Sequence, residues 1–266
     1  MIEVKNISKK YGSKAVVNNV SFQIKRGKIT SFIGPNGAGK STVLGMMSRL
    51  LKKDSGEVFI DGKEISKWDT KELSKVMGIL KQSNHLNVRL TIRDLVAFGR
   101  FPHSQGNLTS EDQVKIDEAL AYMQLEDIQH KFLDELSGGQ RQRAFIGMVL
   151  AQDTDYIFLD EPLNNLDMKH SVQIMKMLRR ITDELGKTVV IVIHDINFAS
   201  CYSDEIIALQ DGEIAVTGTV NEIMQASTLS KLYDMEFNVQ EINDKKICVY
   251  YLSLIHISEP TRLRCI

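Results

Sequence analysis

The sequence lacks any apolar run long enough to enter a membrane. Its longest nearly unbroken apolar stretches, residues 144–151 and 189–193, fall far short of the roughly 18 residues that a helix needs to span a bilayer. Residues 1–6 interleave polar and apolar side chains and contain no block of the kind found in secretory signals. We therefore expect a chain that does not itself cross a membrane and stays in the cytosol.

Cysteine is scarce, and neither sign of charge is in excess. Cys201, Cys248 and Cys265 are odd in number, far apart and without a Cys-x-x-Cys pair, which argues against a disulfide scaffold and a zinc site. Lys and Arg total 33 against 34 Asp and Glu, giving a net charge of −1. This balance argues against a protein held on nucleic acid by bulk positive charge, so we expect no nucleic-acid partner.

The composition that remains is that of a folded domain. Hydrophobic residues make up 43% and charged residues 25%, close to globular averages, and 266 residues suffice for one large domain or two small ones at about 150 residues each. Residues 252–262, LSLIHISEPTR, are similar to the in-frame translation of a transposon-end adapter used in sequencing libraries. We expect residues 252–266 to be a non-native tail and Tyr251 to be the last natural residue, the alternative being an ordinary polar tail.

Hydrophobic patterning predicts an α/β core. Three runs are almost wholly apolar, as strands buried on both faces should be: 29–33, 156–159 and 189–193. Antiparallel strands are indicated by period-2 alternation at 20–24 and by Asp-Gly turns at 61–62 and 211–212. Between them, helical spacing places apolar residues on shared faces. These faces comprise Val43, Leu44, Met47, Leu50 and Leu51; Ile116, Leu120 and Met123; and Val172, Met175, Leu178 and Leu185. From about 90 to 152 helical spacing dominates, which predicts a mostly helical insertion.

A phosphate-binding loop is the strongest chemical signal. Residues 34–41, GPNGAGKS, fit G-x-x-x-x-G-K-[ST] and lie after an apolar strand and before an amphipathic helix, as that motif requires. Glycines let backbone N–H groups turn toward phosphate oxygens, Lys40 can reach the outer phosphates, and Ser41 can ligate Mg²⁺. A simple glycine-rich turn is the alternative, and the strand, the lysine and the serine together disfavour it.

Other polar residues gain meaning beside this loop. Asp160 and Glu161 end the apolar strand at 156–159, so one carboxylate could hold Mg²⁺ and the other could accept a proton from water. Ser137 opens a glycine-containing helix start, which by itself is an ordinary N-cap. His194 follows the strand at 189–193, at the sheet edge where ligands of open α/β sheets bind. Gln82 and Tyr11 carry no local signal that distinguishes them from surface residues.

Taken in order, these motifs resemble those of an ATP-binding cassette (ABC) ATPase over about residues 1–238. The residues that carry the resemblance are Tyr11, GPNGAGKST at 34–42, Gln82, LSGGQRQR at 136–143, YIFLDEP at 156–162, NNLD at 164–167 and His194. LSGGQ at this distance before a hydrophobic-Asp-Glu strand separates the family from other phosphate-loop proteins. The resemblance implies one ABC ATPase domain over 1–251, with a phosphate-loop (RecA-like) α/β core, an N-terminal antiparallel β region and a helical subdomain at about 90–152.

The resemblance also implies roles for individual residues. ATP would be bound by Tyr11, stacked on adenine, and by Gly34, Pro35, Asn36, Gly37, Ala38, Gly39, Lys40, Ser41 and Thr42. Mg²⁺ would be organised by Ser41, Gln82 and Asp160; Glu161 would be the general base, with His194 and Gln82 completing the catalytic group. Ser137, Gly138, Gly139, Gln140 and Asp167 would face ATP held by a second cassette, so that two copies work as a head-to-tail pair around two ATP molecules.

Within the family, residues 91–102 and 159–170 resemble the ATPase subunits of bacterial iron-siderophore importers, whose relatives carry haem and cobalamin. This implies a peripheral subunit on the cytoplasmic face of the membrane, partnered by permease subunits and indirectly by a substrate-binding protein. Another transported substrate and a soluble, non-transport ABC protein remain as alternatives. A phosphate-loop kinase or GTPase is disfavoured, because no Asn-Lys-x-Asp guanine motif is present and Glu161 suits water as the acceptor.

Overall fold

The computed structural model of the chain describes residues 1–82 and 88–250, and the predicted non-native tail lies outside them. The strands are β1 (Ile2–Tyr11), β2 (Lys14–Ile24), β3 (Ile29–Ile33), β4 (Ser55–Ile60), β5 (Lys63–Glu64), β6 (Met77–Leu80), β7 (Tyr156–Asp160), β8 (Thr188–Val192), β9 (Glu205–Gln210), β10 (Glu213–Thr219), β11 (Asn238–Ile242) and β12 (Lys245–Val249). The helices are α1 (Lys40–Met47), α2 (Thr70–Val76), α3 (Ile92–Phe98), α4 (Phe101–Ser104), α5 (Ser110–Tyr122), α6 (Gly138–Ala151), α7 (Met168–Leu185), α8 (Ile196–Tyr202), α9 (Val220–Ile223) and α10 (Ala226–Tyr233).

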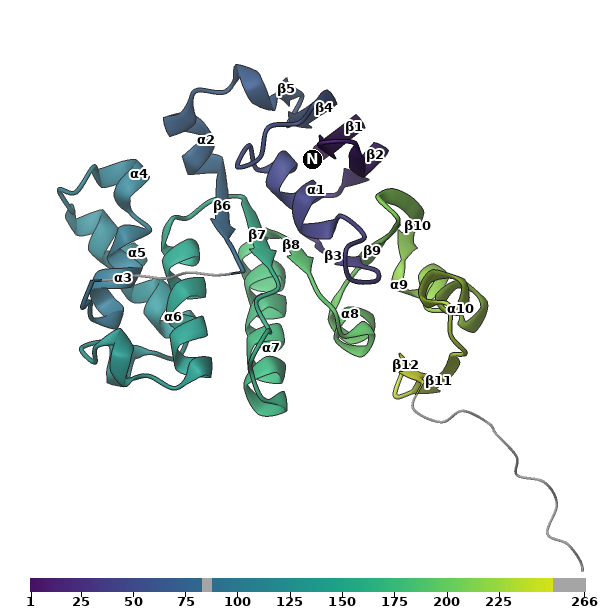
Figure 1. The fold of residues 1–266 in the computed structure, drawn as a ribbon. Coiled ribbons are helices and arrows are strands. Elements are labelled where there is room, and N and C mark those ends of the chain that lie inside the picture. The colour runs from purple at the N-terminus through teal and green to yellow at the C-terminus, as the bar shows by residue number, and fades with distance from the viewer. Residues whose placement is uncertain (83–87, 251–266) are drawn as a thin grey trace, which may run out of the picture.

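A six-stranded sheet in the order β10-β9-β3-β8-β7-β6 forms the centre of the fold. Strands β9, β3, β8, β7 and β6 pair in parallel, and β10 closes the edge as the antiparallel partner of β9. A second sheet, in the order β2-β1-β4-β5, is antiparallel and lies on the other side of α1 (Figure 1). The predicted α/β core with an N-terminal antiparallel β region is therefore confirmed.

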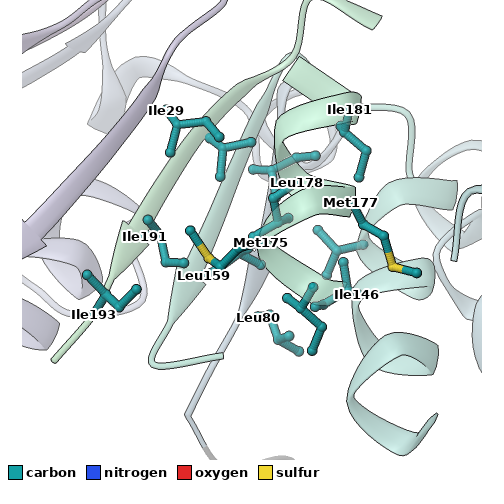
Figure 2. Close-up of a cluster of buried hydrophobic side chains, with 14 of the residues drawn as sticks. Ile29, Leu80, Ile146, Leu159, Met175, Met177, Leu178, Ile181, Ile191 and Ile193 are labelled. Carbon is teal, nitrogen blue, oxygen red and sulfur yellow. The ribbon is translucent and has the colours of Figure 1, made fainter. Parts of the chain in front are cut away.

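Alternating side chains of the central strands fill two separate cores. Ile29 and Ile33 of β3 face one core, while Phe32 faces the other, because successive residues of a strand point to opposite faces. The first core lies against α6, α7 and α8, and Figure 2 shows sheet residues such as Leu159 and Ile191 packed on Met175 and Leu178 of α7. The second lies against α1 and the antiparallel sheet. Helices on both faces explain why these strands are apolar throughout.

Helices α3, α4, α5 and α6 form the helical part of the predicted fold, at one end of the central sheet (Figure 1). Helix α6 runs back toward the sheet, and its side chains Ile146 and Val149 belong to the same core as β7. A buried ion pair, Arg100 Nε to Asp112 Oδ1 at 2.7 Å, joins the turn before α4 to the first turn of α5. In the part of the chain that the structure covers, no helix has the length and apolar character required to span a bilayer.

Some predicted helical faces were wrong at their ends. Helix α1 stops at Met47, because Arg49 takes a left-handed φ of 59°, so Leu50 is 51% exposed instead of sharing the buried face. In α7, Leu185 is the last helical residue and is 40% exposed. The short helices α9 and α10 and the β11–β12 hairpin had no counterpart in the sequence-based prediction.

Candidate active site

The loop between β3 and α1 has the backbone geometry of a phosphate cradle. Gly34, Gly37 and Gly39 have φ values of 136°, 81° and 97°, a region that L side chains rarely adopt. A Cβ at Gly34 would lie 2.0 Å from the carbonyl oxygen of Leu209, and one at Gly39 would lie 2.7 Å from that of Val16. Glycine is therefore required at both positions by space as well as by conformation.

Lys40, the first residue of α1, extends its side chain back along the loop. Its Nζ donates to the carbonyl oxygens of Gly34 at 2.8 Å and Pro35 at 3.0 Å, and the residue is only 5% exposed. Burial lowers the pKa of the ammonium, while the carboxylates of Glu161 and Asp160 oppose that shift. The loop thus encloses a cation that can neutralise an anionic ligand.

Ser41 and Asp160 bring two hard oxygens together across the sheet edge. The Ser41 Oγ donates to Asp160 Oδ1 at 2.8 Å. Burial raises the pKa of the Asp160 carboxyl, and the hydrogen bond from Ser41 opposes that shift. A hydroxyl and a carboxylate beside a phosphate loop form the donor set that Mg²⁺ uses together with phosphate oxygens and water. The residues present therefore fit this ion.

Glu161 lies at the centre of a polar cluster. Its backbone φ of 50° turns the chain directly after β7, and its carboxylate is 11% exposed. His194 Nε2 lies 2.8 Å from one carboxylate oxygen, and Gln82 Nε2 donates to the other at 2.6 Å. The side-chain amide of Asn164 also donates to that second oxygen. A partly buried carboxylate held by these groups can accept a proton from a bound water.

Two cavities adjoin the loop and share Gln82. The first, about 360 Å³, is lined by Tyr11, Ser41, Thr42, Asp160 and residues of α1 and β6. The second, about 730 Å³, is lined by Gly34, Pro35, Asn36, Gly37, Gln82, Glu161, Asn164, His194 and Tyr233. Both lie at the carboxyl ends of β3, β6, β7 and β8, where open α/β sheets bind ligands. Tyr11 is 53% exposed, with Lys9 Nζ 5.6 Å from its ring centroid.

Residues 137–140 begin α6 away from these cavities. Ser137 caps the helix, with its Oγ accepting from Gln140 N at 3.3 Å and the Gln140 side chain accepting from Ser137 N at 3.0 Å. Gly139 packs on His170, where a Cβ would lie 2.3 Å from the imidazole. His170 is fixed by Asp167, whose Oδ1 lies 2.8 Å from His170 Nδ1 and caps α7. Among the described residues, neither cavity is lined by any of residues 137–140 or Asp167.

The structure therefore divides the predicted site residues into two groups. The group around the cavities contains Tyr11, the loop residues, Gln82, Asp160, Glu161 and His194, and the other contains Ser137, Gly138, Gly139, Gln140 and Asp167. The sequence predicted no role for His170 or Tyr233, and it indicated Asn164 only as part of a motif. The spacing Asp167-x-x-His170 at a helix start could have indicated His170, whereas no sequence feature connects Tyr233 to the loop.

The fold and this arrangement are those of a nucleotide-binding cassette, and comparison with known proteins agrees. A family model described as "ABC transporter" matches residues 17–164, and the chain belongs to this family. It is 65% identical over 251 residues to the petrobactin import ATP-binding protein YclP of Bacillus subtilis, covering 94% of this chain and 100% of that one.

Two further similarities bear on substrate and assembly. The chain is 40% identical to the iron(3+)-hydroxamate import ATP-binding protein FhuC of B. subtilis, covering 91% of each chain. The dimeric structure of MJ0796, a bacterial ABC transporter cassette, superposes with a TM-score of 0.73 at 35% identity, covering 83% of this chain and 99% of that one. The fold class and the family expected from the sequence, those of an ATP-binding cassette, are thus confirmed.

Proposed function

We propose that this chain is the ATPase subunit that couples ATP binding and hydrolysis to import of an iron-siderophore complex through a membrane permease. The observation that carries the proposal is the 65% identity, over the full length of the relative, to a protein named for petrobactin import. FhuC, at 40% identity, is named for a different ferric chelate, iron(3+)-hydroxamate. The two relatives are named for different chelators, so the proposal specifies an iron chelate as the imported substrate and not a particular chelator.

The chemistry of hydrolysis falls to Glu161 and its neighbours. Glu161 is the general base for the attacking water, because its carboxylate is partly buried and adjoins the loop cavity. His194 and Gln82 orient that carboxylate in the described state and, as polar groups on the wall of the same cavity, would contact the γ-phosphate side of ATP. Tyr11, on the wall of the neighbouring cavity, would stack on the adenine.

Mg²⁺ would be held by Ser41, Asp160 and Gln82. Bound there with ATP, Mg²⁺ would supply charge neutralisation at the phosphate oxygens. Ser41 and Asp160 already bond to each other at 2.8 Å, and the raised pKa of Asp160 reflects a buried carboxyl that gains from a nearby cation. Gln82 lines both cavities: it shares one with Ser41 and Asp160, and in the other its side-chain amide donates to Glu161.

A second copy of the cassette would complete each site. Residues 137–140 and Asp167 lie away from their own loop cavities, although glycines and a serine at a helix start suit a phosphate. In a head-to-tail pair, Ser137, Gly138, Gly139, Gln140 and Asp167 of one copy would close the ATP site of the other. The dimeric cassette MJ0796, at 35% identity, supports this assembly.

The permease would dock over a groove between the helical part and the core. A cavity of about 480 Å³ is lined by Arg49, Leu50, Thr70, Leu73, Met77 and Gln152, with four further residues. Gln152 Nε2 donates to the carbonyl oxygen of Met77 at 3.2 Å, which ties the end of α6 to β6. The exposed Leu50 gives this groove an apolar edge that a permease loop can cover, which would place the chain at the cytoplasmic face of the membrane.

The test is uptake of radioiron-labelled petrobactin by B. subtilis cells that lack YclP and express this chain. We expect wild type to restore uptake and Glu161→Gln at equal expression to leave it at background. A parallel assay with ferric hydroxamate in cells lacking FhuC tests the chelator. Active ATP hydrolysis by the purified chain with no uptake in either strain would overturn the siderophore assignment and favour haem, cobalamin, a metal ion or a soluble, non-transport role.

A further inference from the structure

The start of the phosphate loop is held by a residue from the far end of the described chain. Tyr233, the last residue of α10, accepts a hydrogen bond at its hydroxyl from the Gly34 backbone N–H, with 3.1 Å between nitrogen and oxygen. Tyr233 also lines the 730 Å³ cavity together with Glu161 and His194. The contact therefore joins the C-terminal segment directly to the site.

Both backbone polar groups of Gly34 are engaged, and the residue has no room to shift toward the sheet. Its N–H is bonded by Tyr233 and its carbonyl oxygen by Lys40 Nζ at 2.8 Å. On the β9 side, a Cβ at Gly34 would lie 2.0 Å from the Leu209 carbonyl oxygen. The β9 backbone and the Tyr233 hydroxyl together define where the loop leaves β3.

Tyr233 is in turn held by the C-terminal segment. Its ring centroid lies 5.7 Å from that of Phe237, which lies 5.4 Å from that of Tyr250. Burial raises the pKa of Tyr233 to about 12, so the hydroxyl stays neutral at cellular pH. The same segment is tied to α8, because Asn197 exchanges hydrogen bonds with the backbone of Cys248 at 2.7 and 3.2 Å.

We propose that Tyr233 is a positioning residue, which holds Gly34 so that the phosphate loop has its nucleotide-binding conformation before nucleotide arrives. The inference rests on the proposed role of that loop in binding ATP. A loop ordered in advance loses less conformational freedom on binding, so the bond adds to affinity for any nucleotide that fills the loop. This hydrogen bond affects nucleotide binding more than the chemical step, because the Tyr233 hydroxyl contacts the backbone of Gly34 and not the side chain of Glu161.

Tyr233→Phe tests this, because it keeps the ring against Phe237 and removes only the acceptor of the Gly34 N–H. We expect affinity for a fluorescent ADP analogue to fall about three- to tenfold, as loss of one such bond predicts. The KM for ATP should rise by a similar factor while kcat changes less than about twofold. Tyr202→Phe is the matched control. Tyr202 lies in α8, away from the loop, and its ring centroid is 6.2 Å from that of Phe198. Removal of its hydroxyl should leave the ADP affinity and the KM for ATP unchanged.

The outcomes separate this inference from the proposed function. Unchanged ADP affinity in Tyr233→Phe overturns it, as does an equal loss in Tyr202→Phe. Weaker ATP binding with unchanged ADP binding also overturns it, since that pattern indicates contact with the γ-phosphate. Phe237→Leu, which retains the hydroxyl but loosens its support, should weaken ADP binding in the same direction. Failure of wild type to bind any nucleotide would instead contradict the function proposed for the loop.

Discussion

His194 Nε2 and Glu161 Oε1 lie 2.8 Å apart although they follow different strands, β8 and β7. The two strands are neighbours in the parallel sheet, so the residues after their carboxyl ends meet at one edge. The φ of 50° at Glu161 turns its side chain into that edge, while Asp160 remains in register with Val192 and faces Ser41. Two adjacent carboxylates are thus given different surroundings, one beside an imidazole and one beside a hydroxyl.

Glu161→Gln should lower ATP turnover by about 10²- to 10⁴-fold, because the amide cannot accept the proton of the attacking water. Nucleotide binding should persist, since the loop and Lys40 are intact, and ATP should therefore trap a dimer visible by size-exclusion chromatography. Glu111→Gln, at an exposed carboxylate in α5, is the control and should behave as wild type. If Glu161→Gln keeps about a tenth or more of the turnover measured for the control, Glu161 is not the general base.

Lys40→Ala should weaken ADP binding by at least about tenfold, because the buried ammonium is the cation enclosed by the loop. Isothermal titration with ADP and Mg²⁺ measures the loss. Lys52→Ala, at an exposed lysine soon after α1, should bind ADP normally. Equal affinities for wild type and Lys40→Ala would mean that the nucleotide does not enter this loop.

Gly139→Ala should lower the free energy of unfolding by about 1–3 kcal/mol, because its Cβ would lie 2.3 Å from the His170 ring. Gly138→Ala is a close control: the nearest atom to its Cβ would be Leu166 Cδ2 at 3.7 Å, an ordinary contact. Urea unfolding measures both. Adding His170→Ala removes the ring atoms at 2.3 and 2.4 Å but leaves the Cβ of residue 170 at 2.9 Å, so it should return part of the stability lost in Gly139→Ala. A double variant as unstable as the single one would contradict the steric explanation.

Asp112→Ala should cost about 3–5 kcal/mol of unfolding free energy, because it leaves Arg100 buried without its partner and removes a helix cap. Asp117→Ala, which removes an exposed partner of Arg93 at 2.6 Å, should cost less than about 1 kcal/mol. Urea midpoints of the two variants and wild type provide the comparison.

The Asp112 contribution should also depend on pH. The Thr109 backbone N–H, followed by the Arg100 side chain, lowers the Asp112 pKa to about 2, below its unfolded value of about 3.9. A depressed folded pKa stabilises the native state above the unfolded pKa, and that stability is lost as pH falls through the folded pKa. The gap between wild type and Asp112→Ala should therefore narrow from about pH 4 to pH 2. A constant gap over that range would contradict the pairing.

Leu50→Asp should abolish binding to the permease, because Leu50 is exposed on the groove and belongs to neither core. Leu50 also lines the neighbouring cavity that contains Tyr11, so permease binding is measured without nucleotide. The measurement is co-purification of each variant with the permease subunits of the importer whose uptake activity the wild-type chain restores. Val114→Asp introduces the same charge at a residue of α5 that is 53% exposed, outside the groove, and should bind normally. Normal permease binding by Leu50→Asp would show that the groove is not the docking surface.

Local sequence was sufficient where a motif is built within one continuous segment. The loop at 34–42 could be predicted because a strand, three glycines and a helix start follow one another, and the backbone conformation needs only those neighbours. The Ser137 cap was likewise predictable from its own helix. The end of α1 was not, because Arg49 adopts a left-handed conformation and bonds to the carbonyls of Ile65 and Trp68, which are distant in sequence.

The sequence by itself determined the class of this protein, the order of its strands and helices along the chain and the chemical groups available to it. Only the tertiary structure decided which of those groups meet: it gathered Gln82, Glu161 and His194 into one cluster, kept residues 137–140 apart from their own loop, and set Tyr233 against Gly34. The physical reason is that strand order and the packing of the last helices bring together residues far apart in the chain, and these long-range contacts leave no local spacing to read.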